Sequence, residues 1–215
     1  MSTRNAEKEV QLFDESDLYS TSSYGGFIAA LAENGVEVVT TETFQSGDTD
    51  FSTQLTRIME ANPEAIFVAT LPPEMSLILS QGRELGIPDS VPFILPEIAI
   101  EQVQAAGATA EGVITFTGWS SLAATPGNAA FIQTYTEKYG MAPNAWAAQS
   151  YATLHILAAA IAAAQSTDSA AIRDALANTM NMDTILGQFS FGAVGDAVYD
   201  PQILIVKDGE FAVFE

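Results

Sequence analysis

The chain has 215 residues, 48% of them hydrophobic, so it is long enough and apolar enough to bury a sizeable globular core. Its 27 acidic and 7 basic residues give a net charge of −20. This charge disfavours nucleic acids and anionic membranes, because their phosphate groups would be repelled. The absence of cysteine excludes a disulfide framework, a thiol nucleophile and a cysteine metal site.

The first half of the chain alternates short apolar runs with amphipathic segments. The predicted strands are residues 10–13, 36–41, 65–69, 93–95 and 113–117, with helices between them. This alternation predicts an α/β fold with a parallel sheet and helices on both faces. Because right-handed crossovers bring the carboxyl ends of parallel strands to one edge, Tyr19, Leu71 and Glu97 are expected along that edge, where ligands bind.

Residues 64–100 show this pattern most clearly. Pro72 and Pro73 follow a buried strand and suit the first turn of a helix, and Gly86 ends that helix. The next strand delivers Glu97 just past its end. From the pattern alone, Glu97 is a candidate binding acid or an acid at a helix N-terminus that the helix dipole favours. Tyr19 is likewise a candidate ligand contact or an ordinary half-buried aromatic residue.

The second half of the chain has a different organisation. A linker at 120–128 leads into three successive helices at 129–139, 144–164 and 168–179, followed by strands at 187–191, 203–206 and 211–214. The apolar faces of the three helices need a partner. The alanine-rich run at 145–164 contains too many polar residues for a convincing membrane span, so we expect a packed helix, with His155 as a packed structural residue.

Motifs for enzyme chemistry are mostly absent from the sequence. It has no Gly-x-Ser-x-Gly elbow, no phosphate loop ending in Gly-Lys-Ser/Thr, and no dinucleotide-binding glycine pattern. The acids at 14–17 lack the spacing of a calcium loop and indicate a polar turn, whereas Asp50 is expected to cap the following helix. We therefore predict no enzyme, no metal and no cofactor. The alternative is an α/β enzyme that uses acids at the sheet edge.

Several blocks of the chain resemble type I periplasmic binding proteins of the leucine/isoleucine/valine-binding family. The blocks are KEVQLFDESDLYSTSSYGGF, GVEVVTTETFQSGDTDFSTQLTRI, PEMSLILSQGRELGIP, AAGATAEGVI, FIQTYTEKYG, AWAAQSYATLHIL, GQFSFGAVGD and ILIVKDGEF. Together they extend over nearly the whole chain, but they match only the later part of such proteins. The resemblance implies two α/β lobes joined by three crossover strands that close on an amino acid.

Three residues of the chain correspond to ligand contacts of that family. The resemblance implies that Tyr19 packs on the ligand and that Glu97 holds its ammonium group, which needs a carboxylate partner when it is desolvated. At Leu71 the chain has an aliphatic side chain where amino-acid binders have an aromatic one. The expected ligand contacts are therefore Tyr19, Leu71 and Glu97, and the side-chain specificity is expected to differ.

The resemblance further implies that an N-terminal segment of the first lobe is missing. Residues 8–121 and 200–215 would form the second, Rossmann-like lobe, and residues 122–199 would supply helices and a strand of the first lobe without its sheet. The implied function is the solute-binding component of an ABC transporter for branched-chain amino acids, present as a fragment. The alternative is a ligand-sensing domain for amides or other small solutes in a signalling protein.

The implied partners are an amino acid and a transporter permease. The isolated helices would bind the missing segment of the first lobe or associate with another copy. The implied location is periplasmic or extracytoplasmic, although residues 1–9 are polar and do not form an export signal. Nucleic acid is not expected as a partner.

Overall fold

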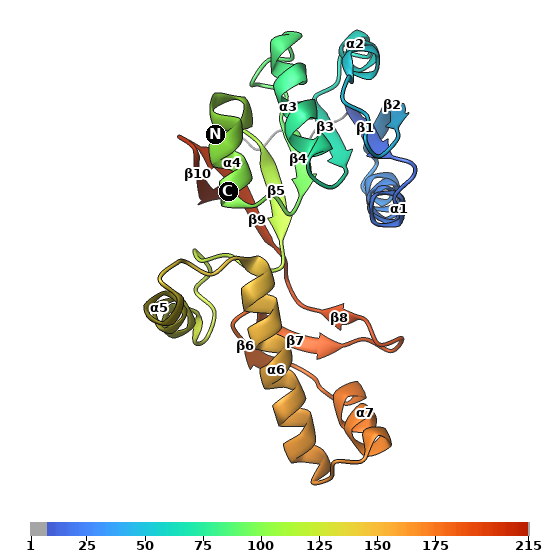
Figure 1. Ribbon diagram of the computed structural model, residues 1–215. Helices are drawn as coiled ribbons and strands as arrows, with labels where there is room; N and C mark the ends of the chain where they lie inside the picture. The colour runs from blue at the N-terminus through green and yellow to red at the C-terminus, as the bar shows by residue number, and fades with distance from the viewer. Residues whose placement is uncertain (1–7, 215) are drawn as a thin grey trace. The chain divides into compact units, whose positions relative to one another are not determined.

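The computed structural model describes residues 8–214, and Figure 1 shows the order of their helices and strands. The chain divides into two compact units: residues 1–116 with 203–215 form unit 1, and residues 117–202 form unit 2. The sequence placed the corresponding boundaries at 121/122 and 199/200. That the two units are the lobes of a two-lobed protein stays a prediction.

Unit 1 is built on a seven-stranded sheet in the order β10-β9-β5-β4-β3-β1-β2. Strands β1 to β5 pair in parallel, whereas β10 is antiparallel to β9. The strands are β1 (Lys8–Asp14), β2 (Glu37–Phe44), β3 (Ala65–Ala69), β4 (Phe93–Pro96), β5 (Ile114–Thr117), β9 (Gln202–Lys207) and β10 (Glu210–Val213). The parallel sheet predicted from the alternating pattern is confirmed.

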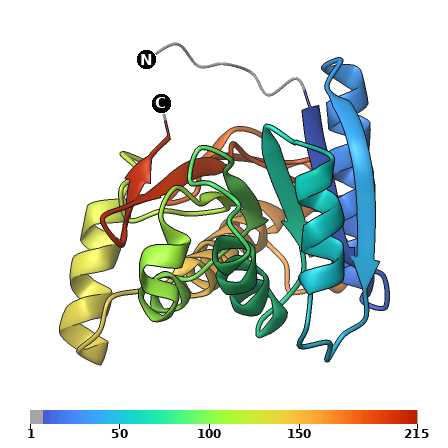
Figure 2. The ribbon, with the colours of Figure 1, turned by 90° about the horizontal axis from the view of Figure 1, so that it is seen from above.

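Helices cover both faces of this sheet, as predicted, but unequally. Helix α1 (Leu18–Glu33) lies on one face, and α2 (Ser52–Glu60), α3 (Glu74–Glu84) and α4 (Ile100–Ala106) lie on the other (Figure 2). A short 3₁₀ turn, η1 (Gly107–Ala110), follows α4. The chain moves from β1 outward to β2 and then back through β3, β4 and β5, so right-handed crossovers place α1 opposite the other helices.

The larger core lies beneath α2, α3 and α4. Five apolar side chains of this region are fully buried against the sheet. They are Phe51, just before α2, Leu55 and Ile58 in α2, and Ile78 and Leu79 in α3. On the other face a stack of aromatic rings joins α1 to the strands: Phe27 lies 3.8 Å from Phe67, and Phe67 lies 6.5 Å from Phe116, between ring centroids.

Unit 2 contains the three predicted helices and a small sheet. The helices are α5 (Asn128–Tyr139), α6 (Ala145–Ala164) and α7 (Ser169–Ala177). The sheet has the order β6-β7-β8 and comprises β6 (Met182–Thr184), β7 (Gly187–Phe191) and β8 (Ala197–Val198). The expectation of helices with a single strand is therefore wrong in detail, because β6 and β8 are too short to carry an alternating pattern.

Helix α6 buries only a narrow stripe: Ala148, Ala152, Ile156 and Ala160. By length and composition α6 could cross a membrane, which is weak evidence by itself. His155, expected to be packed, is exposed, and its ring centroid lies 4.3 Å from that of Tyr151.

The expectation that Asp50 caps α2 was also wrong. The N-cap of α2 is residue 51, which makes no side-chain bond to the helix, and Asp50 accepts a hydrogen bond from the backbone N–H of Ser52.

Candidate ligand-binding site

The three residues proposed as ligand contacts follow three neighbouring strands of unit 1. Tyr19 comes after β1, Leu71 after β3 and Glu97 after β4, and these strands are adjacent in the order β4-β3-β1. Because the strands are parallel, all three residues lie at the carboxyl edge of one sheet. The structure thus places them along the edge that the sequence predicted.

Tyr19 lies in the first turn of α1, and its side chain is 43% exposed. The turn is fixed by Asp17, which is the N-cap and accepts hydrogen bonds from the backbone N–H and the hydroxyl of Ser20. Burial raises the pKa of the Tyr19 hydroxyl; a hydrogen bond with Ser23 lowers it, and the negative charges of Glu97 and Asp17 raise it further.

Glu97 is half-buried and directly follows β4. Its backbone has a positive φ of 40°, which is uncommon outside glycine, and its N–H donates to the carbonyl of Phe116 on the neighbouring strand at 3.1 Å. The next N–H, of Ile98, donates to the Thr115 hydroxyl at 3.3 Å. Because two bonds to β5 hold this turn, the Glu97 carboxylate is presented from a fixed backbone, as is common for residues of functional sites.

Leu71 lies between the other two residues in strand order and is 47% exposed. It is followed by Pro72 and Pro73, which are joined by a cis peptide bond, and α3 begins at Glu74. Because Leu71 follows the strand between those of Tyr19 and Glu97, this edge carries an exposed apolar side chain as well as an anionic group.

The loops at this edge carry negative charge only. Among residues 8–214, the carboxyl-edge loops of unit 1 contain acids at positions 14, 15, 17, 48, 50 and 97 and no lysine or arginine. Lys8, Arg83 and Lys207 lie at the opposite, amino edge, and Arg57 pairs with Glu42 at 3.1 Å. The edge is therefore suited to a cationic group.

Asp14 organises this edge, a role that the sequence did not reveal. The sequence indicated only a polar turn at 14–17, but Asp14 is 3% exposed. Its carboxylate accepts from the backbone N–H of Ser16 at 2.9 Å, from the Ser16 hydroxyl at 2.6 Å, and from the Ser46 hydroxyl. Burial alone would raise the pKa of Asp14, but these bonds outweigh it and lower the pKa. The sequence did contain one signal for this role, the Asp-x-Ser spacing of Asp14 and Ser16, because an aspartate often accepts a hydrogen bond from the backbone N–H two residues later.

A second set of contacts fixes the loop between β2 and α2. Glu74, 7% exposed at the start of α3, accepts a hydrogen bond from the N–H of Gly47 at 2.7 Å. Gln81 accepts from the N–H of Phe51 and donates to the carbonyl of Thr49, both at 2.8 Å. Residues from two different turns of α3, Glu74 and Gln81, therefore fix the backbone of this loop at the carboxyl edge.

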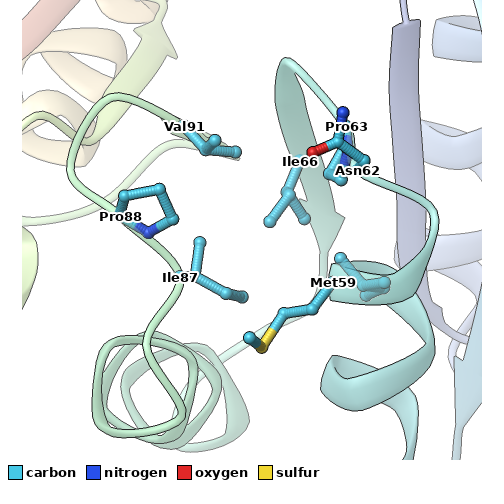
Figure 3. Close-up of a pocket in the computed structure, with 8 residues that line it drawn as sticks. Met59, Asn62, Pro63, Ile66, Ile87, Pro88 and Val91 are labelled. Atoms are coloured by element: carbon cyan, nitrogen blue, oxygen red, sulfur yellow. The ribbon is translucent and has the colours of Figure 1, made fainter.

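An apolar pocket of about 230 Å³ lies elsewhere in unit 1 (Figure 3). It is placed at the amino edge, between the end of α2, the start of β3 and the loop after α3. Its lining residues are Ile58, Met59, Asn62, Pro63, Ile66, Ile87, Pro88 and Val91. Because these eight residues include no charged group, this pocket is not the site for a charged solute.

A family model described as periplasmic binding protein matches residues 4–209. The chain belongs to this family. Its relatives include a Leu/Ile/Val-binding protein homolog 2 of Brucella abortus strain 2308, which is 26% identical and matches 92% of this chain and 55% of the relative. The Leu/Ile/Val/Thr-binding protein of Salmonella typhimurium is 28% identical over 92% of this chain and 52% of the relative.

Solved structures agree with this assignment. The leucine-binding protein LivK of Thermotoga maritima MSB8 is 31% identical with a TM-score of 0.88, covering 98% of this chain and 60% of that one. The branched-chain amino acid substrate-binding protein LivJ of Streptococcus pneumoniae, solved with isoleucine, is 29% identical with a TM-score of 0.81, covering 98% and 60%. The type I periplasmic-binding-protein fold predicted from the sequence is confirmed. The chain spans about half the length of the curated relatives that it matches.

Proposed function

We propose that this chain is part of the solute-binding component of an ABC transporter and contributes one wall of a site for a branched-chain type of amino acid. It acts by binding rather than by catalysis, since its family consists of binding proteins. The relatives in Brucella and Salmonella, a Leu/Ile/Val-binding protein homolog and a Leu/Ile/Val/Thr-binding protein, support this class of ligand. Transporters of this kind place the protein outside the cytoplasm, with a permease as its partner.

The observation that carries the proposal is the half-buried Glu97 at an edge whose described loops hold no cation. Its negative charge raises the pKa of Tyr19, and Leu71 follows β3, the strand between β1 and β4, at the same edge. A desolvated ammonium bound to a carboxylate contributes about 1.5–3 kcal/mol, which corresponds to roughly 10- to 150-fold in affinity. In this proposal Glu97 holds the ammonium of the ligand, and Tyr19 and Leu71 contact its aliphatic part.

The first test uses a form extended to two lobes, with leucine, isoleucine and valine in a thermal-shift assay. We expect stabilisation by these amino acids and its loss in Glu97→Gln. The matched control is Glu15→Gln, which removes an exposed acid at the same edge whose side chain accepts a hydrogen bond from Gln45. Equal stabilisation of the Glu97→Gln variant and the unaltered protein would contradict the role of Glu97.

The second test uses the chain as it is. Unit 1 offers a carboxylate and apolar surface but, in its described loops, no cation at the carboxyl edge, so it should recognise the amine end of the ligand and not the acid end. At millimolar concentrations, 3-methylbutylamine should therefore perturb the NMR signals of Tyr19 at least as strongly as leucine, and 4-methylpentanoate should not. Stronger perturbation by 4-methylpentanoate than by the amine would exclude an ammonium site.

We further propose that the exposed face of α6 is covered by the remainder of a first lobe in a two-lobed form. Opposite its buried stripe, α6 presents Trp146, Leu154, Leu157 and Ile161, which are 56%, 67%, 37% and 38% exposed. A helix with one packed side normally has a polar opposite face, so this face fits a second apolar layer. The isolated chain should self-associate through it.

Light scattering over a range of concentrations tests this. We expect oligomers of the chain and a shift towards monomer in Leu154→Lys. A clean monomer of the unaltered chain at high concentration would refute self-association.

A further inference from the structure

A carboxyl group and an amide are buried together on β1, and the proposed ligand site uses neither of them. Glu9 is 2% exposed and Gln11 is 0% exposed. Val10 and Leu12 belong to the core beneath α2, α3 and α4, so Glu9 and Gln11, which alternate with them, point to the face of α1. The Nε2 of Gln11 donates to the Glu9 carboxyl at 3.4 Å. The two polar groups are therefore neighbours on the face of the sheet that α1 covers.

The last turns of α1 lie at the level of Glu9. Helix α1 runs from the carboxyl end of β1 to the amino end of the parallel strand β2, so it is antiparallel to β1. Phe27 stacks on Phe67, with 3.8 Å between ring centroids, and Phe67 is opposite Gln11 in the β1–β3 register. One turn after Phe27, the buried Leu31 advances along the helix by about the distance that separates Gln11 from Glu9 on the strand. Helix α1 thus covers the pair.

The charges around Glu9 disfavour its ionised form. Among residues 8–214 its carboxyl makes no ion pair. The charged residues at this end of the packed elements are acids: Glu37 on β2, Glu64 before β3 and Glu33 in the last turn of α1. Lys8 is adjacent in sequence, but it is exposed and the alternation directs its side chain to the opposite face. Burial raises the pKa of Glu9 to about 7, and the carbonyl end of α1 also favours the neutral acid.

Gln11 provides an independent observation. Its Oε1 atom is buried and has no hydrogen-bond partner in the described part of the chain. A buried acceptor without a partner costs about 1–3 kcal/mol, so a donor is expected beside it. An ionised carboxylate can only accept hydrogen bonds, whereas a protonated carboxyl has an O–H to donate. The proton that makes Glu9 neutral is therefore also the donor that Gln11 lacks.

We propose that Glu9 is protonated and donates its O–H to the Oε1 of Gln11, which donates its N–H in return, so that a neutral acid–amide pair clamps the last turns of α1 onto the sheet. When Glu9 loses the proton, the Oε1 of Gln11 loses its donor and a negative charge remains beneath the helix. Rising pH then favours the opening of α1. This inference holds whether or not Glu97 binds an ammonium.

An NMR titration of the unaltered chain, with carbon-13 in the glutamate and glutamine side chains, tests where the proton lies. The signals are assigned with Glu9→Gln and Gln11→Met. We expect the carboxyl carbon of Glu9 to titrate at about pH 7 and the amide carbon of Gln11 to shift with the same midpoint. A Glu9 carboxyl that is already ionised at about pH 6, or a Gln11 signal that does not follow it, would overturn the acid–amide pair.

Amide hydrogen exchange tests the clamp, with α3 on the other face of the sheet as the internal reference. Opening restores the ordinary pKa of Glu9, 4.5, in place of about 7. After correction for the intrinsic pH dependence of exchange, the opening of the last turns of α1 should therefore increase by about 50- to 100-fold from about pH 5 to about pH 8.

In Glu9→Gln this increase should vanish, because the new amide can donate to Gln11 at every pH. The matched control is Glu37→Gln, which removes an exposed acid of β2 opposite Lys8 and should retain the increase. An equal increase in Glu9→Gln, or none in the unaltered chain, would overturn the clamp. If Glu9→Gln does not fold, the exchange and the Gln11 titration of the unaltered chain still decide.

Discussion

Replacement of Asp14 by alanine should destabilise unit 1 and loosen the turn that carries Tyr19. The buried carboxylate accepts three hydrogen bonds from Ser16 and Ser46. Each bond to a charged acceptor contributes about 1.5–3 kcal/mol, but Ser16 and Ser46 are exposed and can bond to water instead, so the sum does not apply. We expect a loss of about 2 kcal/mol, or roughly 4–8 °C in Tm for a chain of this size.

The measurement is urea unfolding followed by circular dichroism, because both tryptophans, Trp119 and Trp146, lie in unit 2 and fluorescence would not report on unit 1. Asp50→Ala is a matched control: Asp50 accepts from Ser52 with the same spacing, at 3.0 Å, but is exposed. The stabilising effect of Asp14 is present above its unfolded pKa and is lost as the pH falls through the lowered folded pKa. The stabilities of Asp14→Ala and the unaltered protein should therefore begin to converge as the pH falls below about 4. Equal losses for Asp14→Ala and Asp50→Ala at neutral pH would refute this reasoning.

Three other predictions follow from unit 1. Burial raises the pKa of Glu9 from 4.5 to about 7, so its contribution to stability is full below pH 4.5 and is lost as the pH rises from 4.5 to about 7, by on the order of 3 kcal/mol. Glu9→Gln should abolish this decline in a pH series of urea unfolding, and an unchanged decline would exclude Glu9 as its source. Gly82→Ala should destabilise the protein by about 1–2 kcal/mol in thermal unfolding, because the new Cβ would lie 2.6 Å from the buried Phe93 ring. Gly26→Ala in α1, where nothing lies within 4 Å of the new Cβ, should stabilise the protein. Similar effects of the two substitutions would contradict the tight packing of α3 on β4. Glu97→Gln should lower the pKa of Tyr19, because it removes a negative charge that raises this pKa. The Tyr19 titration is the part of the ultraviolet pH titration that disappears in Tyr19→Phe. An unshifted Tyr19 titration in Glu97→Gln would show that the two side chains do not interact.

Much of unit 1 could be predicted from the sequence because its signals are local and strong. The buried run 65–69, the Pro72–Pro73 turn and Gly86 each have one dominant physical explanation, and all lie where the pattern placed them. The position of Glu97 after β4 followed from the alternation of strands and helices, and the crossover rule then determined its edge.

The features that were missed depend on contacts between distant segments. Asp14 and Ser46 are 32 residues apart, so the acidic turn gave no indication that one of its acids is buried. Strand β8 has only two residues and exists because it pairs with β7. Asp50 has the residue type of an N-cap, but the helix begins one residue later than an Asp50 cap requires.

The site that we propose at the carboxyl edge of unit 1 recognises only part of an amino acid. An amino acid carries a carboxylate as well as an ammonium, and helix N-termini are common sites for such anions. In α1 the backbone N–H of Ser20 is bonded to the Asp17 carboxylate, and α3 is preceded by Pro72 and Pro73, which have no N–H to donate. With no lysine or arginine in the described loops at this edge, the site that we propose offers a partner for the ammonium and for the aliphatic chain but no cation for the carboxylate. We therefore expect a site built from unit 1 alone to bind amines as well as it binds amino acids.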